Sequence, residues 1–399
     1  EVKSIDVRKK QVAIYDIKNK KTYRESFDKL ILSPGAVPIK PSIKGFDAPN
    51  VFTLRDIPDA LAIKNYVDEH SPKSAIVVGA GFIGMELVEN LHRRGIAITI
   101  VELASQVLAP LDAEMASLIH QHLKEKKVEF YLNEEIKEVE YQKEFSLVKL
   151  NSGREIKTDM LLISIGVRPE VTLAKEAGLE LGQRGGIKVD RNLRTSHPDI
   201  YAIGDAIEVL DYINRNPVLI PLAAPANKQG RIVANNICGK CGKTEEYEGT
   251  QGTYILKIFE MTVAATGNNE KLLRKFNIPY EKSITHSASH AGYYPEARPL
   301  SIKLIFSPEN GKILGAQIVG YDGVDKRIDV IATAIRAGMT VYDLEKLELA
   351  YAPPYSSAKD PVNIAGYVAS NILKGDIKII HWHDIEKLNQ ENSVLVDVR

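Results

Sequence analysis

The chain has 399 residues, and its 52 Lys and Arg residues balance its 52 Asp and Glu residues. Because domains usually hold roughly 100–200 residues, we expect several domains. The balanced charge gives no overall field that would attract nucleic acid or a membrane surface, so neither is predicted as a partner. The chain has no apolar run long enough to span a bilayer, no signal-like segment and only two cysteines, Cys238 and Cys241. These features predict a soluble, cytoplasmic protein without a disulfide scaffold.

Both ends of the chain have the pattern of a strand. Residues 1–7 alternate apolar and polar side chains with no leading Met, and residues 393–399 stop as an apolar strand is being completed. We therefore expect the chain to be an internal piece of a longer polypeptide.

The predicted elements begin with short strands punctuated by charged turns, at residues 4–7, 11–17, 22–26 and 30–32. Helical spacing follows over 56–70, and a strand follows at 75–78. Strands and helices then alternate as far as residue 166, which predicts a parallel sheet with crossover helices, interrupted by an antiparallel section at 135–155.

A different pattern starts near residue 252 and predicts a separate α+β unit. Its strands are expected at 254–258, 283–286, 300–305 and 313–318, and its helices at 326–337 and 362–373. After residue 375 a new segment begins, with a helix-like stretch before the closing strand.

A glycine-rich turn, Gly79-Ala80-Gly81-Phe82-Ile83-Gly84, lies between a predicted strand and a predicted helix. Gly79 allows the tight turn, Gly81 leaves room for a pyrophosphate, and Gly84 lets the helix approach the sheet, with the helix N-terminus facing the phosphate charge. Glu102 closes the next strand, where a carboxylate binds an adenosine ribose diol and repels a 2′-phosphate. The turn therefore predicts a nicotinamide dinucleotide site that favours NADH, with NADPH as the alternative.

Three further residues are assigned to cofactor binding. Glu86, expected in the first turn of that helix, either complements the helix dipole or lies beside the nicotinamide. Gly35 and Gly166 each follow an apolar strand and a small residue, and we expect each to mark the exit from a dinucleotide domain.

A second marker consists of Thr195 and the string Ile200-Tyr201-Ala202-Ile203-Gly204-Asp205. With this marker, the chain from about Glu1 to Leu373 resembles the two-dinucleotide pyridine nucleotide-disulfide oxidoreductases. The resemblance implies an α/β flavoprotein with Rossmann-like FAD and NAD domains and a C-terminal α+β interface domain. It implies that Asp205 holds the ribityl chain of FAD, and Gly204 would permit the close approach. The helix that opens with Pro221-Leu222-Ala223 would then offer backbone N–H groups to the flavin pyrimidine.

The resemblance divides the chain into five parts. These are the C-terminal part of the first FAD segment (1–52), the NAD(P)-binding domain (53–168), the second FAD segment (169–247), the dimerisation or interface domain (248–374) and the start of a rhodanese-like domain (375–399). The family's first FAD motif and its redox cysteine are expected upstream of Glu1.

Three strings, at residues 285–295, 325–329 and 349–360, resemble one subgroup, the coenzyme A disulfide reductases, and residues 380–399 resemble the opening of a rhodanese domain. The resemblance implies that NADH reduces FAD and that the flavin passes electrons to one cysteine, which reduces coenzyme A disulfide or a coenzyme A persulfide. It implies that Tyr293 and Tyr351 reach that cysteine from the partner subunit of a homodimer.

Two further residues complete the site that the resemblance implies. Lys359 would supply positive charge for a thiolate or for a coenzyme A phosphate. Asn227 either contacts coenzyme A or caps a helix.

Three alternative functions stay open at this point: an NADH oxidase or peroxidase, a polysulfide or persulfide reductase, and a non-catalytic flavin-binding module. His286 and His290 lie in a loop with no third ligand in view, so no metal is predicted. The segment Cys238-Gly239-Lys240-Cys241 has no second ligand pair and is interpreted as a polar turn without redox function.

Overall fold

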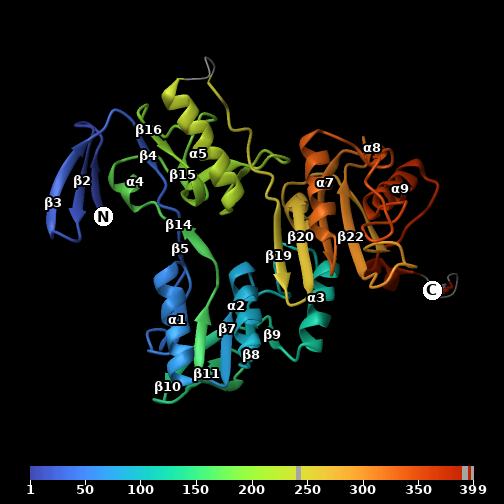
Figure 1. Cartoon of the computed structure of the whole chain (residues 1–399), viewed down its shortest axis with the longest axis horizontal. Coiled ribbons are helices and arrows are strands. Elements are labelled where there is room, and N and C mark those ends of the chain that lie inside the picture. The colour runs from blue at the N-terminus through green and yellow to red at the C-terminus, as the bar shows by residue number, and fades with distance from the viewer. Residues whose placement is uncertain (240–243, 389–393, 397–399) are drawn as a thin grey trace.

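The computed structural model of the chain describes residues 1–239, 244–388 and 394–396. Figure 1 shows the α/β part of the chain and an α+β unit at the opposite side, with the N-terminal sheet and the helix at residues 361–374 far apart. No helix among the described residues is both long and apolar enough to cross a membrane.

The first α/β unit is assembled from two separate parts of the sequence. Strand β4 (Leu30–Leu32) pairs in parallel with β16 (Ile200–Ala202), although about 170 residues lie between them. An antiparallel sheet extends from this unit, with the strands β1 (Val2–Asp6), β2 (Gln11–Asp16) and β3 (Lys21–Ser26). The remaining elements of the unit are α4 (Thr172–Glu176), β15 (Ile187–Lys188), the 3₁₀ helix η1 (Gly204–Ala206), β17 (Ile207–Leu210), β18 (Pro217–Val218) and α5 (Ala223–Cys238).

The second α/β unit contains the predicted parallel sheet, in the order β6-β13-β7-β8-β9. The predicted antiparallel section is also present, as the separate sheet β10-β11-β12. The strands are β6 (Val51–Thr53), β7 (Ser74–Val78), β8 (Ala97–Glu102), β9 (Glu129–Leu132), β10 (Ile136–Tyr141), β11 (Ser146–Leu150), β12 (Glu155–Thr158) and β13 (Met160–Ile163). The helices are α1 (Ile57–His70), α2 (Phe82–Arg93) and α3 (Ala113–Glu125).

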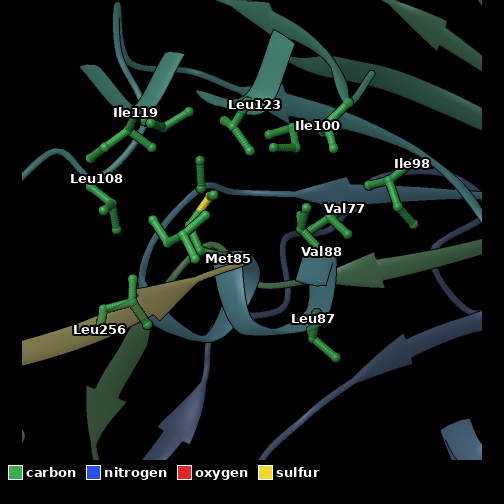
Figure 2. Close-up of a cluster of buried hydrophobic side chains, with 14 of the residues drawn as sticks. Val77, Met85, Leu87, Val88, Ile98, Ile100, Leu108, Ile119, Leu123 and Leu256 are labelled. Carbon is green, nitrogen blue, oxygen red and sulfur yellow. The ribbon is translucent and has the colours of Figure 1, made fainter. Parts of the chain in front are cut away.

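Apolar side chains of β7, β8, α2 and α3 form the core of this second unit, as Figure 2 shows. Burying each of the large ones stabilises the fold by about 1.5–3 kcal/mol. Leu256, from the first strand of the C-terminal unit, belongs to the same cluster. The nucleotide-binding sheet and the C-terminal unit therefore share one continuous core.

A two-stranded antiparallel ribbon joins the two α/β units. It pairs β5 (Ala36–Pro38) with β14 (Val167–Pro169). Gly35 and Gly166 lie at its two ends: the Glu170 N–H donates to the Gly35 carbonyl at 2.9 Å, and the Ile39 N–H donates to the Gly166 carbonyl at 3.0 Å. Both glycines thus stand where the chain passes between the units.

The C-terminal unit is a five-stranded antiparallel sheet in the order β19-β20-β23-β22-β21, with helices packed against it. Its strands are β19 (Tyr254–Ile258), β20 (Met261–Gly267), β21 (Glu281–Ala288), β22 (Pro299–Phe306) and β23 (Ile313–Gly320). Its helices are α6 (Glu270–Lys275), α7 (Val324–Arg336), α8 (Val341–Leu344) and α9 (Pro361–Lys374). The sequence did not predict β20, in which Ala264, Ala265 and Gly267 have low strand propensity.

Buried charged side chains connect this unit to the second α/β unit. Lys303 on β22 is 0% exposed, and its ammonium lies 2.9 Å from Asp112, the N-cap of α3, and 2.6 Å from Glu114. It also pairs with Glu270, which is 2.7 Å from Lys282. Burial works to raise the pKa of Glu270, but hydrogen bonds from the two lysines lower it to about 2.

The segment after α9 contains one short 3₁₀ helix, η2 (Trp382–Lys387). The predicted closing strand is wrong for residues 394–396, which pair with no other strand and are highly exposed. A strand needs a neighbour for its backbone hydrogen bonds, and the apolar pattern alone does not supply one. The other residues of that prediction lie outside the described residues, as does Cys241.

Candidate functional site

The glycine turn has the geometry that its three glycines predict. Gly79 has φ +94°, and a Cβ there would lie 2.4 Å from the Ser164 carbonyl oxygen. A Cβ on Gly84 would lie 2.1 Å from the Gly79 carbonyl oxygen, so the helix approaches the turn as closely as glycine permits. A Cβ on Gly81 would meet nothing within 4 Å, and this open space faces the start of α2. The turn is therefore tight where protein packs and open where a pyrophosphate would lie.

Glu102 ends β8 beside this turn. Its Oε2 accepts a hydrogen bond from the Ala80 N–H at 2.6 Å, and its Oε1 accepts one from the Ala104 N–H at 2.8 Å. Each carboxylate oxygen has a second lone pair. The side chain thus holds the turn and retains acceptor capacity for a ribose hydroxyl.

The three other predicted residues of helix α2 differ in their burial and contacts. Phe82 packs against Tyr254 of β19 with ring centroids 4.7 Å apart, whereas the Ile83 side chain is exposed. Glu86 was expected in the first turn of α2, and this is wrong: the helix begins at Phe82, Glu86 is exposed, and the first turn has no acidic residue. Because the dipole effect falls off within the first turn, Glu86 does not complement the helix dipole there.

The predicted flavin motif lies where β16 runs into η1. The Gly204 N–H donates to Gln229 Oε1 of α5 at 2.7 Å, and a Cβ on Gly204 would lie 3.7 Å from Ser33 Oγ. Asp205 is half-buried, and burial raises the pKa of its carboxyl. Among the described residues its carboxylate accepts no hydrogen bond, which leaves it free for hydroxyl donors.

Helix α5 starts close to this motif. Leu222 is its N-cap and provides no side-chain hydrogen bond, and Ala223 at the first position is exposed. The first N–H groups are thus without a side-chain cap, as an anion site requires. Asn227 does not cap the helix, because it lies inside it and its amide donates to the Ala223 carbonyl at 2.9 Å. The capping alternative for Asn227 is therefore wrong.

Two tyrosines that are 58 residues apart in the sequence meet at the surface of the C-terminal unit. The hydroxyl oxygens of Tyr293 and Tyr351 are 2.9 Å apart, and the side chains are 76% and 47% exposed. Tyr293 lies in the turn between β21 and β22, and Tyr351 lies in the loop between α8 and α9. The hydrogen bond with Tyr351 raises the pKa of Tyr293. We call these two side chains the phenol pair.

Lys359 lies in the same loop as Tyr351 and is exposed. Its ammonium makes no hydrogen bond or ion pair within the described residues, and it does not contact the phenol pair. It stands next to Asp360, the N-cap of α9.

The remaining candidates have ordinary surroundings. His286 pairs with Ser301 Oγ at 2.8 Å, and His290 lies between Ser289 Oγ and the Pro295 carbonyl. Within the described ranges, no three His, Cys, Asp or Glu residues gather as a metal site would need. Cys238 is the exposed last residue of α5.

The sequence matches the family described as Pyridine nucleotide-disulphide oxidoreductase over residues 1–230, and the dimerisation domain of that family over residues 254–361. The chain belongs to the pyridine nucleotide-disulphide oxidoreductases. A curated relative, the Coenzyme A disulfide reductase of Staphylococcus haemolyticus (strain JCSC1435), is 35% identical over 373 residues, which cover 93% of this chain and 82% of the relative.

Two solved structures of similar proteins extend the comparison. Reduced Bacillus anthracis CoADR-RHD is 53% identical, with a TM-score of 0.94 over 97% of this chain and 69% of that one. The NAD-dependent persulfide reductase from A. fulgidus is 36% identical, with a TM-score of 0.92 over 98% of this chain and 71% of that one. The predicted family and its α/β fold with a C-terminal dimerisation domain are thus confirmed.

One buried residue near the phenol pair escaped the sequence reasoning. Arg327 of α7 is 1% exposed, and it had been noticed only as part of the string at 325–329. The helical spacing of the apolar residues could have identified it, because Arg327 lies on the same buried face of α7 as Val324, Ile328 and Ile331. A charged side chain at a buried position needs hydrogen-bond acceptors or an opposite charge around it.

Proposed function

We propose that this chain works in an FAD-dependent reductase that passes electrons from NADH to a cysteine upstream of Glu1, and from there to coenzyme A disulfide or a coenzyme A persulfide. The names of the relatives favour this substrate class. The observation that carries the proposal is the phenol pair, two exposed hydroxyls 2.9 Å apart in the unit that matches the dimerisation domain.

Phenols suit sulfur chemistry. A hydroxyl with an ordinary pKa of about 10 can donate a hydrogen bond to a sulfur anion or protonate a departing thiolate. The cysteine thiolate would attack one sulfur of the disulfide, the S–S bond would break, and Tyr293 would give a proton to the departing coenzyme A sulfur. Two electrons from NADH and one proton would then split the mixed disulfide, which restores the cysteine thiolate and releases the second coenzyme A as a thiol. Tyr293 would regain its proton from the solvent.

The residues of the two α/β units are suited to bind NADH and FAD. The open space at Gly81 and the start of α2 would take the NADH pyrophosphate, and Glu102 would bind the adenosine ribose. Asp205 would bind the ribityl hydroxyls of FAD, and the first turn of α5 would face the flavin pyrimidine. When bound, the flavin supplies two-electron transfer between a nicotinamide and a thiol.

We propose a homodimer in which the phenol pair of one subunit serves the cysteine of its partner. The match to a dimerisation domain and the exposure of both phenols support this arrangement. Lys359, exposed and without an ion pair among the described residues, would then meet a coenzyme A phosphate or a thiolate, and Asn227 of α5 would contact coenzyme A. A cytoplasmic location, the rhodanese-like start at 375–399 and the five-part domain division belong to the same proposal.

Persulfide reduction is the second candidate, favoured by the 36% identical NAD-dependent persulfide reductase. The phenol pair serves both substrates, because each reaction releases a sulfur anion that needs a proton. The ratio of kcat/KM for coenzyme A persulfide to that for coenzyme A disulfide decides between them.

The test uses the full-length holoenzyme under anaerobic conditions, with NADH. Coenzyme A disulfide turnover that exceeds oxygen consumption in a parallel aerobic assay supports the proposal, and absence of disulfide turnover sinks it. Tyr293→Phe should reduce disulfide turnover by roughly 10²-fold or more, the range of a positioned general acid, and leave flavin reduction by NADH unchanged. Tyr355→Phe, a neighbouring phenol that is 73% exposed, is the matched control and should have no effect.

A further inference from the structure

The Arg327 guanidinium lines the same cavity as Tyr351, and all three of its nitrogens donate hydrogen bonds. Its Nε donates to Asp360 at 3.2 Å, its Nη1 donates to the Gly323 carbonyl at 3.1 Å, and its Nη2 donates to the Ser289 carbonyl at 2.8 Å. Nη2 also donates to Ser356 Oγ at 3.1 Å. A planar fork with five N–H donors can bind this many acceptors at once, and a lysine cannot.

These acceptors belong to the two segments that carry the tyrosines. Ser289 opens the turn that contains Tyr293, and Ser356 lies five residues beyond Tyr351 in the other loop. The Ala291 N–H donates to the Ser356 carbonyl at 3.0 Å, so the two segments also touch directly. Arg327 is thus the side chain that binds both segments at the point where they meet.

Open space borders the Tyr351 loop on one side. A cavity of about 420 Å³ lies between this loop and the start of α7, and its lining includes Lys326, Tyr351 and Tyr355. The hydrogen bonds of Ser356 therefore act on a segment that borders open space on one side. Gly323 leaves room for the guanidinium, because a Cβ at this position would lie only 1.9 Å from Arg327 Nη1.

We propose that Arg327 is a positioning residue that holds Tyr293 and Tyr351 within hydrogen-bond distance. The pair has a separation of 2.9 Å, and a shift of one loop by about 1 Å would break a hydrogen bond of that length. The effect on turnover rests on the proposed function, whereas the effect on the phenol hydrogen bond does not.

The first measurement therefore reads the hydrogen bond itself. In the full-length holoenzyme, 3-fluorotyrosine at position 293 is titrated by ¹⁹F NMR, with Tyr351→Phe defining the pKa without the hydrogen bond. Arg327→Lys keeps the charge and should lower the pKa of residue 293 to the Tyr351→Phe value. Ser356→Ala removes one hydroxyl and keeps the ion pair, so it should lower the pKa in part, even if Arg327→Lys fails to fold. Arg336→Lys, the same substitution on the same helix, should leave it unchanged.

The second measurement separates the two halves of the reaction. Arg327→Lys should lower kcat for coenzyme A disulfide about tenfold or more, part of the roughly 10²–10⁴-fold that a positioned acid contributes. The rate of flavin reduction by NADH should stay the same, and adding Tyr351→Phe should cause little further loss. If both half-reactions fall together, or if residue 293 keeps its wild-type pKa in Arg327→Lys and Ser356→Ala, the inference is overturned. If wild type lacks disulfide turnover, the proposed function fails and the NMR titration still decides the role of Arg327.

Discussion

Replacing Glu102 with Gln tests the nucleotide site, because the carboxylate has both a structural and a proposed binding role. Its two oxygens hold the Ala80 and Ala104 N–H groups at 2.6 and 2.8 Å. Gln keeps the shape and presents one acceptor oxygen, so one backbone N–H faces an NH₂ group. A charge-assisted hydrogen bond contributes about 1.5–3 kcal/mol, and the free energy of unfolding should fall by about that amount.

The same replacement removes one charged acceptor from the ribose of NADH. A loss of about 1.5–3 kcal/mol corresponds to a rise of roughly 10- to 150-fold in the KM for NADH. The KM for NADPH should fall or stay constant, because the repulsion of a 2′-phosphate disappears. Steady-state kinetics with both nucleotides measure the ratio, and urea unfolding measures the stability.

Glu129→Gln, the same change at an exposed position of β9 in the same sheet, is the control and should alter neither quantity. A variant at Glu102 that loses stability and keeps the wild-type ratio of NADH to NADPH would show that Glu102 only fastens the turn. The binding role proposed for it would then be refuted.

Three further changes follow from the same structure. Gly81→Ala should leave stability unchanged and weaken NADH binding, since its Cβ meets nothing within 4 Å in the protein; Gly84→Ala should destabilise the fold, since its Cβ would lie 2.1 Å from a carbonyl oxygen. Thermal unfolding with NADH titration measures both, and equal NADH affinity in Gly81→Ala and wild type contradicts the pyrophosphate site. Lys303→Met should lower the free energy of unfolding by about 3–5 kcal/mol, because it leaves buried carboxylates unpaired, and a loss below about 1 kcal/mol in urea unfolding argues against a buried network. Burial lowers the pKa of His122, so the unfolded chain binds more protons than the folded chain once the pH is below about 6.5. As the pH decreases from there toward the lowered pKa, the free energy of unfolding should decrease. Urea titrations at several pH values should show a smaller decrease in His122→Gln than in wild type.

The fold was predictable wherever a local pattern is strong. The turn at 79–84 combines a strand, three spaced glycines, a helix and Glu102, and each of these is a short-range signal. The strand β20 escaped because Ala264, Ala265 and Gly267 have low strand propensity, and the closing strand at 394–396 failed because pairing requires a neighbour that a pattern does not reveal. The sequence analysis did not predict the parallel pairing of β4 with β16, because these strands are far apart in the sequence and no local pattern connects them.

The site was predictable in its parts and less so in its assembly. Tyr293 and Tyr351 were named from the resemblance, but only the structure brings their hydroxyls together. Arg327 escaped because its distant acceptors lie in two segments, the turn after β21 and the loop before α9, and the sequence does not show that these segments meet at this helix. The capping alternative for Asn227 failed because helix α5 already begins at Ala223, and helix boundaries are uncertain when they are read from sequence.

Helix α2, which follows the glycine turn, packs against the C-terminal unit that carries the phenol pair. Glu89 on α2 is 5% exposed and accepts a hydrogen bond from the Phe259 N–H, in the turn between β19 and β20, at 2.9 Å. Phe82, the first residue of that helix, packs on Tyr254 of β19, and the buried Lys303 joins β22 to the start of α3. Close-packed contacts and paired buried charges shift in discrete steps or not at all. These contacts join the glycine turn to the C-terminal sheet, whereas the separation of the two phenols depends on the hydrogen bonds of the two loops that carry them.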